Sequence, residues 1–92
     1  MVGNIRHKGL REFFQDGNKA GIAAGHVRKL RLILTALNSA ESVMDLSAPI
    51  FRLHALRGNR KGRWAMDVSG AWRVTFEFRD GEAIDVDYEQ YH

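Results

Sequence analysis

The last third of this 92-residue chain alternates apolar and polar residues in three runs, and turn residues separate the runs. Trp64–Val68, Trp72–Phe78 and Ala83–Tyr88 alternate with the period of two that a half-buried strand requires. Ser69-Gly70 and Arg79-Asp80-Gly81 lie between these runs and favour tight turns. We therefore predict an antiparallel meander, whose apolar face must be covered by other parts of the chain.

Two amphipathic helices are expected before the sheet. Leu10, Phe13 and Phe14 have helical spacing, and Gly17 is a suitable C-terminal stop. A second apolar stripe has the same period and contains Val27, Leu30, Leu34 and Leu37. Packing both helices on the apolar sheet face gives one core, which suits a chain of this length. The predicted fold class is α+β: residues 1–92 form a single domain in which two N-terminal helices cover one face of a small, mostly antiparallel sheet.

Three further details of the sheet follow from residue spacing. Residues 50–55 have the alternation of an extended segment, and residues 3–7 are a candidate first strand. In the last strand, the apolar face is expected to hold Ile84, Val86 and Tyr88. The opposite face of the sheet is then polar, which makes it a candidate place for chemistry.

Basic residues are concentrated in the middle of the chain, which carries a net charge of +3. Residues 50–73 contain six Lys or Arg against one carboxylate, whereas residues 77–92 contain six carboxylates against one Arg. A basic stretch of this density can bind a polyanion, or it can be a solvated surface that its neighbours neutralise. Both interpretations stay open on the residues alone.

Several classes of site are absent from the sequence. The chain has no cysteine, which excludes disulfides and Cys-based zinc sites and fits a reducing cytoplasm. Its four histidines lack metal-ligand spacing, and neither a P-loop nor a G-x-S-x-G motif is present. No run approaches the ~20 apolar residues of a membrane span. We predict no metal, no cofactor and no membrane association.

The groups that remain for catalysis are Arg, His and Tyr side chains. The last predicted strand leads into the pair Tyr91-His92, and an imidazole can exchange protons near neutral pH. Such a set suffices for RNA cleavage, because RNA supplies its own nucleophile, the 2′-OH. The protein must align that hydroxyl, neutralise the phosphate with Arg, and move protons to and from two oxygens. The structural alternatives are a solvated chain end for His92 and a satisfied structural histidine for His54.

The arginines have structural alternatives as well. Arg60 lies in a glycine-containing loop and can pair with a carboxylate such as Asp67. Arg73 lies on the expected polar sheet face and can pair across strands with Asp85 or Asp87.

Four stretches carry motifs at recognisable separations. Ile50–Trp64 contains the pattern L-H-x-L-K/R-G-x-R-x-G-x-W, and Ala71–Phe76 is similar to W-R-I-x-F. His7–Leu10 reads H-K-G-L, and Asp87–His92 is similar to Y-x-D-Y-H. In this order and over the whole chain, they resemble HigB-type toxins of the RelE superfamily.

The resemblance implies a metal-independent, ribosome-dependent endoribonuclease, a toxin that cuts mRNA codons in the ribosomal A site and inhibits translation. By position, it implies an active set that consists of His54, Arg57, Arg73, Tyr91 and His92. Further contacts to RNA or the ribosome are expected from Arg60, Lys61 and Arg63. Arg57 stands where the family often has Lys. Gln90 stands where an acidic residue is common, which leaves the proton transfers to His54 and His92.

The resemblance also implies a protein partner, a helix-turn-helix antitoxin of the HigA type. No segment of this sequence has the pattern of a helix-turn-helix, so operator DNA would be bound only through the complex with the antitoxin. The alternative function is a non-catalytic RNA- or ribosome-binding module that inhibits translation by occupancy. A third possibility is a plain protein-interaction partner.

Overall fold

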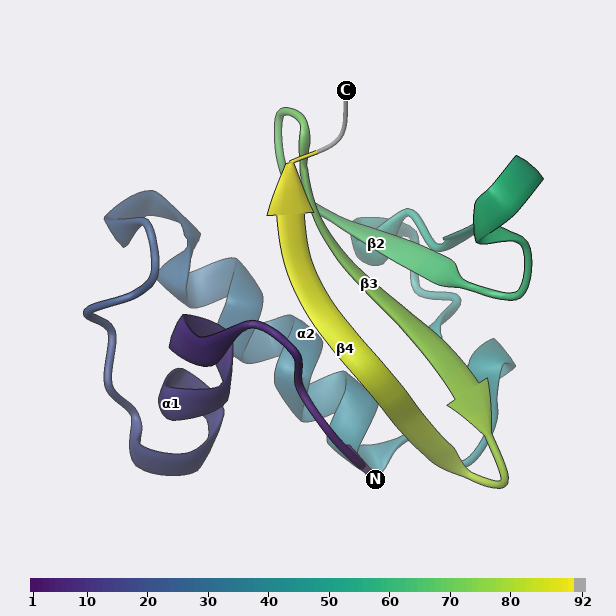
Figure 1. Ribbon diagram of the computed structural model, residues 1–92, viewed down its shortest axis with the longest axis horizontal. Helices are drawn as coiled ribbons and strands as arrows, with labels where there is room; N and C mark the ends of the chain where they lie inside the picture. Colours follow the sequence, from purple (N-terminus) through teal and green to yellow (C-terminus); the bar gives the residue numbers. More distant parts are fainter. Residues whose placement is uncertain (91–92) are drawn as a thin grey trace.

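The computed structural model describes residues 1–90, which contain a four-stranded antiparallel sheet with its strands in chain order (Figure 1). The strands are β1 His54–Ala55, β2 Trp64–Ser69, β3 Trp72–Arg79 and β4 Glu82–Gln90. Tight turns join β2 to β3 and β3 to β4, and β3 and β4 make the longest pairing in the sheet. The predicted meander is confirmed.

Two α-helices cover the apolar side of this sheet, as predicted. They are α1 Lys8–Asp16 and α2 Val27–Ser39. Figure 1 shows α2 behind the sheet and α1 beside it, beyond β4. Both contribute to one core, in which Leu10 of α1 and Leu30 of α2 are fully buried against apolar strand residues. Gly17 ends α1 at φ 73°, and its N–H donates to the carbonyls of Glu12 and Phe13, as a left-handed C-cap does.

Short 3₁₀ turns complete the chain between these elements. They are η1 Ala24–His26, η2 Val43–Leu46, η3 Pro49–Phe51 and η4 Gly58–Arg60. Within residues 1–90, no helix combines the length and the apolar character needed to cross a membrane.

Residues 50–55 differ from the extended segment that their alternation predicts. Pro49 starts the η3 turn, and Arg52 follows it in the left-handed region at φ 49°. Proline fits the first position of a helical turn because its φ is fixed there and its missing N–H is not needed. Phe51 is thereby buried while Ile50 is 56% exposed. The strand is therefore reduced to His54–Ala55.

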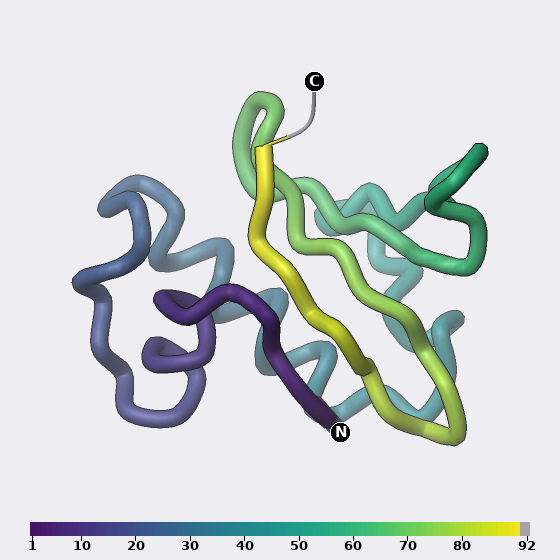
Figure 2. The backbone as a smooth tube through the Cα atoms, viewed as in Figure 1, coloured from purple at the N-terminus to yellow at the C-terminus, as the bar shows by residue number. Residues whose placement is uncertain are grey.

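The N-terminal segment lies along the free edge of β4 (Figure 2). Val2 and Ile5 form isolated parallel bridges with Ala83 and Val86, where a short first strand was predicted. The prediction for Ile84 is wrong, because the β3–β4 register shifts between Thr75 and Glu77. This bulge places Ile84 opposite Glu77 on the polar face.

The extra residue of the bulge is Asp85, at φ 50°. Its N–H donates to the side-chain oxygen of Asn4, and the Asn4 amide donates back to the Asp85 carboxylate, both at 2.9 Å. Asp residues tolerate this left-handed conformation better than most. Ala83 therefore takes the buried position before the bulge, and Val86 and Tyr88 resume the core face after it.

Candidate active site

A pocket of about 310 Å³ lies where β1 and the loop of residues 56–63, called the basic loop below, meet the start of β3. Its lining consists of His54, Ala55, Leu56, Arg57, Arg60 and Arg73. Three of the five residues in the predicted active set thus share one pocket. The other two, Tyr91 and His92, lie outside the described residues.

His54 is presented to this pocket in a defined tautomer. The side chain is exposed on β1, and Nδ1 lies 2.8 Å from the backbone oxygen of Arg52. A carbonyl oxygen can only accept a hydrogen bond, so Nδ1 must carry the proton. Nε2 is then the nitrogen that can take up or release a proton at the pocket.

Arg73 is held in place by Asp67 on the neighbouring strand. The two residues are partners in the β2–β3 register, and Arg73 Nη1 donates to Asp67 Oδ1 at 2.7 Å. The predicted alternatives, Asp85 and Asp87, are not the partners seen here. Asp85 is displaced by the bulge and bonds Asn4, and Asp87 lies opposite Thr75.

Asp67 also binds a second arginine. Its Oδ2 lies 3.1 Å from Nε of Arg52, the residue whose carbonyl orients His54. One carboxylate therefore contacts both Arg73 and the turn that precedes His54.

Arg60 makes a two-pronged ion pair with Glu89 rather than pairing with Asp67. Its Nη1 and Nη2 donate to the two carboxylate oxygens of Glu89 at 2.9 and 2.7 Å. Thr75 Oγ1 donates to the same carboxylate. These hydrogen bonds, led by that of Arg60, hold the pKa of Glu89 below its ordinary value although burial opposes the shift. Glu89 is thus a carboxylate on the polar face, next to the position of Gln90.

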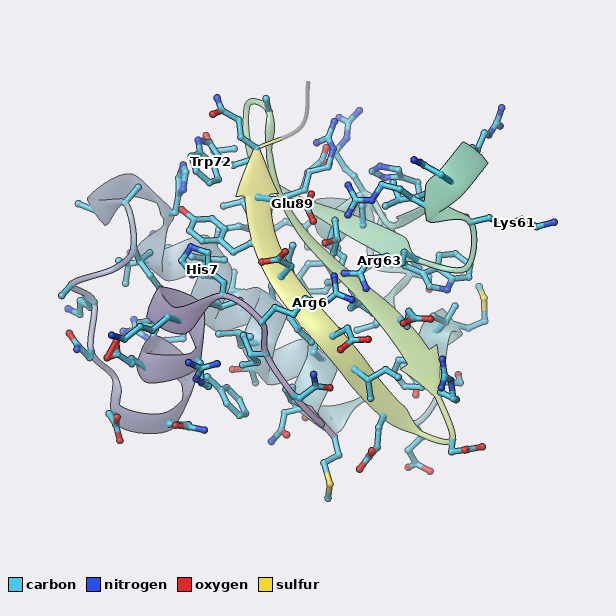
Figure 3. The ribbon with its side chains drawn as sticks, viewed as in Figure 1. Arg6, His7, Lys61, Arg63, Trp72 and Glu89 are labelled. Atoms are coloured by element: carbon cyan, nitrogen blue, oxygen red, sulfur yellow. The ribbon has the colours of Figure 1, made fainter. Side chains whose placement is uncertain are left out.

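Arg63 lies almost buried on that face, with 9% of its surface exposed (Figure 3). Its Nη2 donates to Thr75 Oγ1 at 3.0 Å and to the backbone oxygen of Asp85 at 2.8 Å. Burial, with the nearby Arg6 and Arg60 cations, lowers the pKa of Arg63. The structure gives this side chain a role in supporting the sheet, and its contact with RNA stays a prediction.

A second pocket, of about 370 Å³, adjoins the first along the basic loop. Arg57, Lys61 and Arg63 contribute to its lining. Figure 3 shows Lys61 directed outward at the edge of the molecule. Arg57 lines both pockets and so connects His54 and Arg73 to the rest of the basic loop.

Sequence reasoning missed Asp67 and Glu89 as parts of the site. The signal for Asp67 was the hairpin register, because a turn at Ser69-Gly70 places it close to the position opposite Arg73. The Glu89–Arg60 pair joins residues 29 positions apart and had no such local signal. Among residues 1–90, no three His, Cys, Asp or Glu side chains are grouped to hold a metal ion.

Comparison with known proteins shows which family the sequence matches. Residues 3–92 match the family model described as the RelE-like toxin of type II toxin-antitoxin system HigB. The chain is 37% identical over 92 residues to the endoribonuclease HigB of Proteus vulgaris, and the match covers 100% of both chains.

Solved structures show the same fold. The crystal structure of YafQ from E. coli strain BL21(DE3) has a TM-score of 0.57 at 17% identity, covering 95% of this chain and 91% of that one. A mutant of YafQ from E. coli gives a TM-score of 0.53 at 18% identity with the same coverage.

Proposed function

The chain belongs to the HigB-like family of RelE-like toxins of type II toxin–antitoxin systems, and on that premise we propose that it is a ribosome-dependent endoribonuclease. Its substrate would be mRNA in the ribosomal A site, and cleavage would inhibit translation. The observation that carries the proposal is the pocket that gathers His54, Arg57 and Arg73. It combines a proton-transfer group with two cations of the type that suits a phosphate.

The reaction needs no covalent nucleophile from the protein. The 2′-oxygen of the RNA attacks the adjacent phosphorus, the bond from phosphorus to the 5′-oxygen breaks, and a 2′,3′-cyclic phosphate forms. One proton leaves the 2′-OH and another reaches the departing 5′-oxygen. Arg57 and Arg73 would brace the phosphate and the charge that develops on it.

His54 Nε2 and His92 would carry the two protons, in either order. Tyr91 would stack on the substrate or position its ribose. Neither step requires a metal or a cofactor, because the nucleophile is internal and the Arg pair supplies the positive charge. The family commonly has an acidic residue at the position of Gln90. Glu89 does not take its place, because the Glu89 carboxylate is engaged by Arg60 and Thr75.

RNA and ribosome contacts beyond those of the catalytic set are proposed for Arg60, Lys61 and Arg63. Lys61 is the exposed member of this set, whereas Arg60 and Arg63 also have structural partners. The protein partner would be a helix-turn-helix antitoxin of the HigA type, and operator DNA would be bound through their complex. A protein that acts on translating ribosomes would work in the cytoplasm.

Primer extension on mRNA from ribosomes incubated with the purified protein tests the proposal. Codon-associated cuts are expected, and a single 2′-deoxy substitution at the cut site should abolish them. Arg73→Ala should slow cleavage by about 100-fold or more, and a variant that lacks Tyr91 and His92 should not cleave although it folds. Arg79→Ala, at the far end of β3 with an exposed side chain, is the control.

Two results would overturn the nuclease assignment. One is stalled ribosomes on intact mRNA, which would identify the non-catalytic inhibitor instead. The other is cleavage that Arg73→Ala and His54→Ala leave at the rate of the Arg79→Ala control.

A further inference from the structure

Asp67 does not line the pocket, but it contacts both Arg73 and Arg52, whose carbonyl accepts from His54. On the basis of the nuclease function proposed above, we propose that Asp67 is a positioning residue for RNA cleavage. Its carboxylate orients Arg73 for the phosphate and ties the turn that orients His54 to the same point.

The hold on Arg73 is the stronger of the two contacts. The distance from Arg73 Nη1 to Asp67 Oδ1 is 2.7 Å, and the side chains are only 19% and 24% exposed. A charge-assisted hydrogen bond that water largely cannot reach restricts the rotamers of a long side chain. The register pairs these residues across β2 and β3, so the sheet itself sets the direction of the contact.

The second contact reaches His54 through the backbone. Arg52 Nε lies 3.1 Å from Asp67 Oδ2, and the Arg52 carbonyl accepts from His54 Nδ1 at 2.8 Å. Arg52 itself lies in the left-handed region, at φ 49°. Its side chain is 77% exposed, so this ion pair contributes less than that with Arg73.

Removing the charge of Asp67 allows an effect on positioning to be distinguished from an effect on substrate binding. A carboxylate behind the pocket repels the RNA phosphate, so removing its charge should not weaken binding of the substrate. The orientation of Arg73 should nevertheless be lost. Asp67→Asn is therefore expected to lower kcat without raising KM, a split that general damage to the fold would not produce.

Asp67→Asn keeps the shape of the side chain and removes its charge. In the ribosome cleavage assay we expect kcat to fall by about 10- to 100-fold, with KM equal to or below that of the unmodified protein. Asp67→Glu should restore part of the rate because it returns the carboxylate. Glu77→Gln is the matched control: it removes one carboxylate from β3 whose partner, Arg79, is 64% exposed, and it should cleave normally.

A double variant tests whether Asp67 acts through Arg73. If it does, adding Asp67→Asn to Arg73→Gln should cause little further loss of rate. If the two residues act independently, the fold-losses of the two single variants should multiply. Unchanged kcat in Asp67→Asn would overturn the proposal, as would a rise in KM at constant kcat.

A measurement without ribosomes keeps this proposal separate from the nuclease assignment. In NMR spectra of the isolated protein, the Arg73 guanidinium should show slow rotation and the His54 ring should be protonated at Nδ1. Both signatures should weaken in Asp67→Asn and persist in Glu77→Gln. If they persist in Asp67→Asn, Asp67 does not position these groups. If they weaken but the unmodified protein does not cut mRNA, the nuclease assignment fails, and with it the catalytic role of Asp67.

Discussion

Arg60 donates from both terminal nitrogens to the carboxylate of Glu89, at 2.9 and 2.7 Å, and thereby joins the basic loop to the last strand. Thr75 donates to the same carboxylate and accepts from Arg63, so four side chains form one network beneath the loop. This network anchors the loop that also contains Arg57 and Lys61. The shape of the candidate active site therefore depends on contacts between β4 and a loop that precedes β2.

Glu89→Gln should destabilise the protein in a pH-dependent way. The folded state holds the pKa of Glu89 below its ordinary value, so its stabilisation is complete above the unfolded pKa and is lost as pH falls through the folded pKa. Because the pair is partly exposed, we expect a cost of roughly 1–2 kcal/mol at pH 7. Urea unfolding of both proteins from pH 7 to pH 3 measures this, and the two should converge at the acidic end. A gap that stays constant with pH would contradict it.

Tyr88→Phe should remove one partly buried hydrogen bond and leave the packing intact. Tyr88 is 5% exposed, its hydroxyl lies 2.5 Å from His26 Nδ1, and its ring contacts Trp72 at 4.9 Å between centroids. Burial raises the pKa of this phenol. We expect a loss of about 0.5–1.5 kcal/mol in the free energy of unfolding. In thermal or urea unfolding, a double variant with His26→Ala should show coupling, and strict additivity would argue against the hydrogen bond.

Gly9→Ala should destabilise the protein although alanine favours helices. A Cβ at Gly9 in α1 would lie 2.7 Å from the backbone oxygen and 2.9 Å from Cα of Gly21, and the backbone has little freedom to yield. Gly25→Ala is the control, since a Cβ there meets nothing within 4 Å. By differential scanning calorimetry, Gly9→Ala should melt several degrees below the unmodified protein, because it should be about 1–3 kcal/mol less stable. Gly25→Ala should melt close to the temperature of the unmodified protein. Equal melting temperatures would show that α1 shifts freely against residue 21.

Arg57→Lys should keep most of the cleavage activity, whereas Arg57→Ala should lose it. Lys preserves the positive charge at the edge shared by the two pockets but not the planar fork of Arg. In the ribosome cleavage assay we expect Lys to act within about 10-fold of Arg, and Ala to fall by about 100-fold. If Lys is as inactive as Ala, Arg57 must bind the phosphate through two hydrogen bonds rather than through its charge.

Three members of the predicted active set share one pocket, whereas the contacts that hold them there were not predictable from the sequence. The motif around His54 and Arg57 lies in one stretch of sequence, and Arg73 is identified by the motif of its predicted strand. Arg60 and Arg63 are predicted to contact RNA or the ribosome, with a carboxylate partner as the alternative for Arg60, and in the folded protein Glu89 engages Arg60 and Thr75 engages Arg63. Those partners come from other strands, and spacing along the chain carries no information about which of several carboxylates lies nearest.

The sequence by itself determined the two helices, the three long strands and their order, because periodicity and turn residues act over a few neighbouring positions. Tertiary structure decided the bulge at Asp85, which places Ile84 on the polar face. The Asp85 N–H donates to the side-chain oxygen of Asn4, which lies 81 residues earlier in the chain. It also decided that Asp67, rather than Asp85 or Asp87, holds Arg73. These outcomes depend on strand register and on contacts between distant segments, and a pairing shift of one residue exchanges the two faces of a strand.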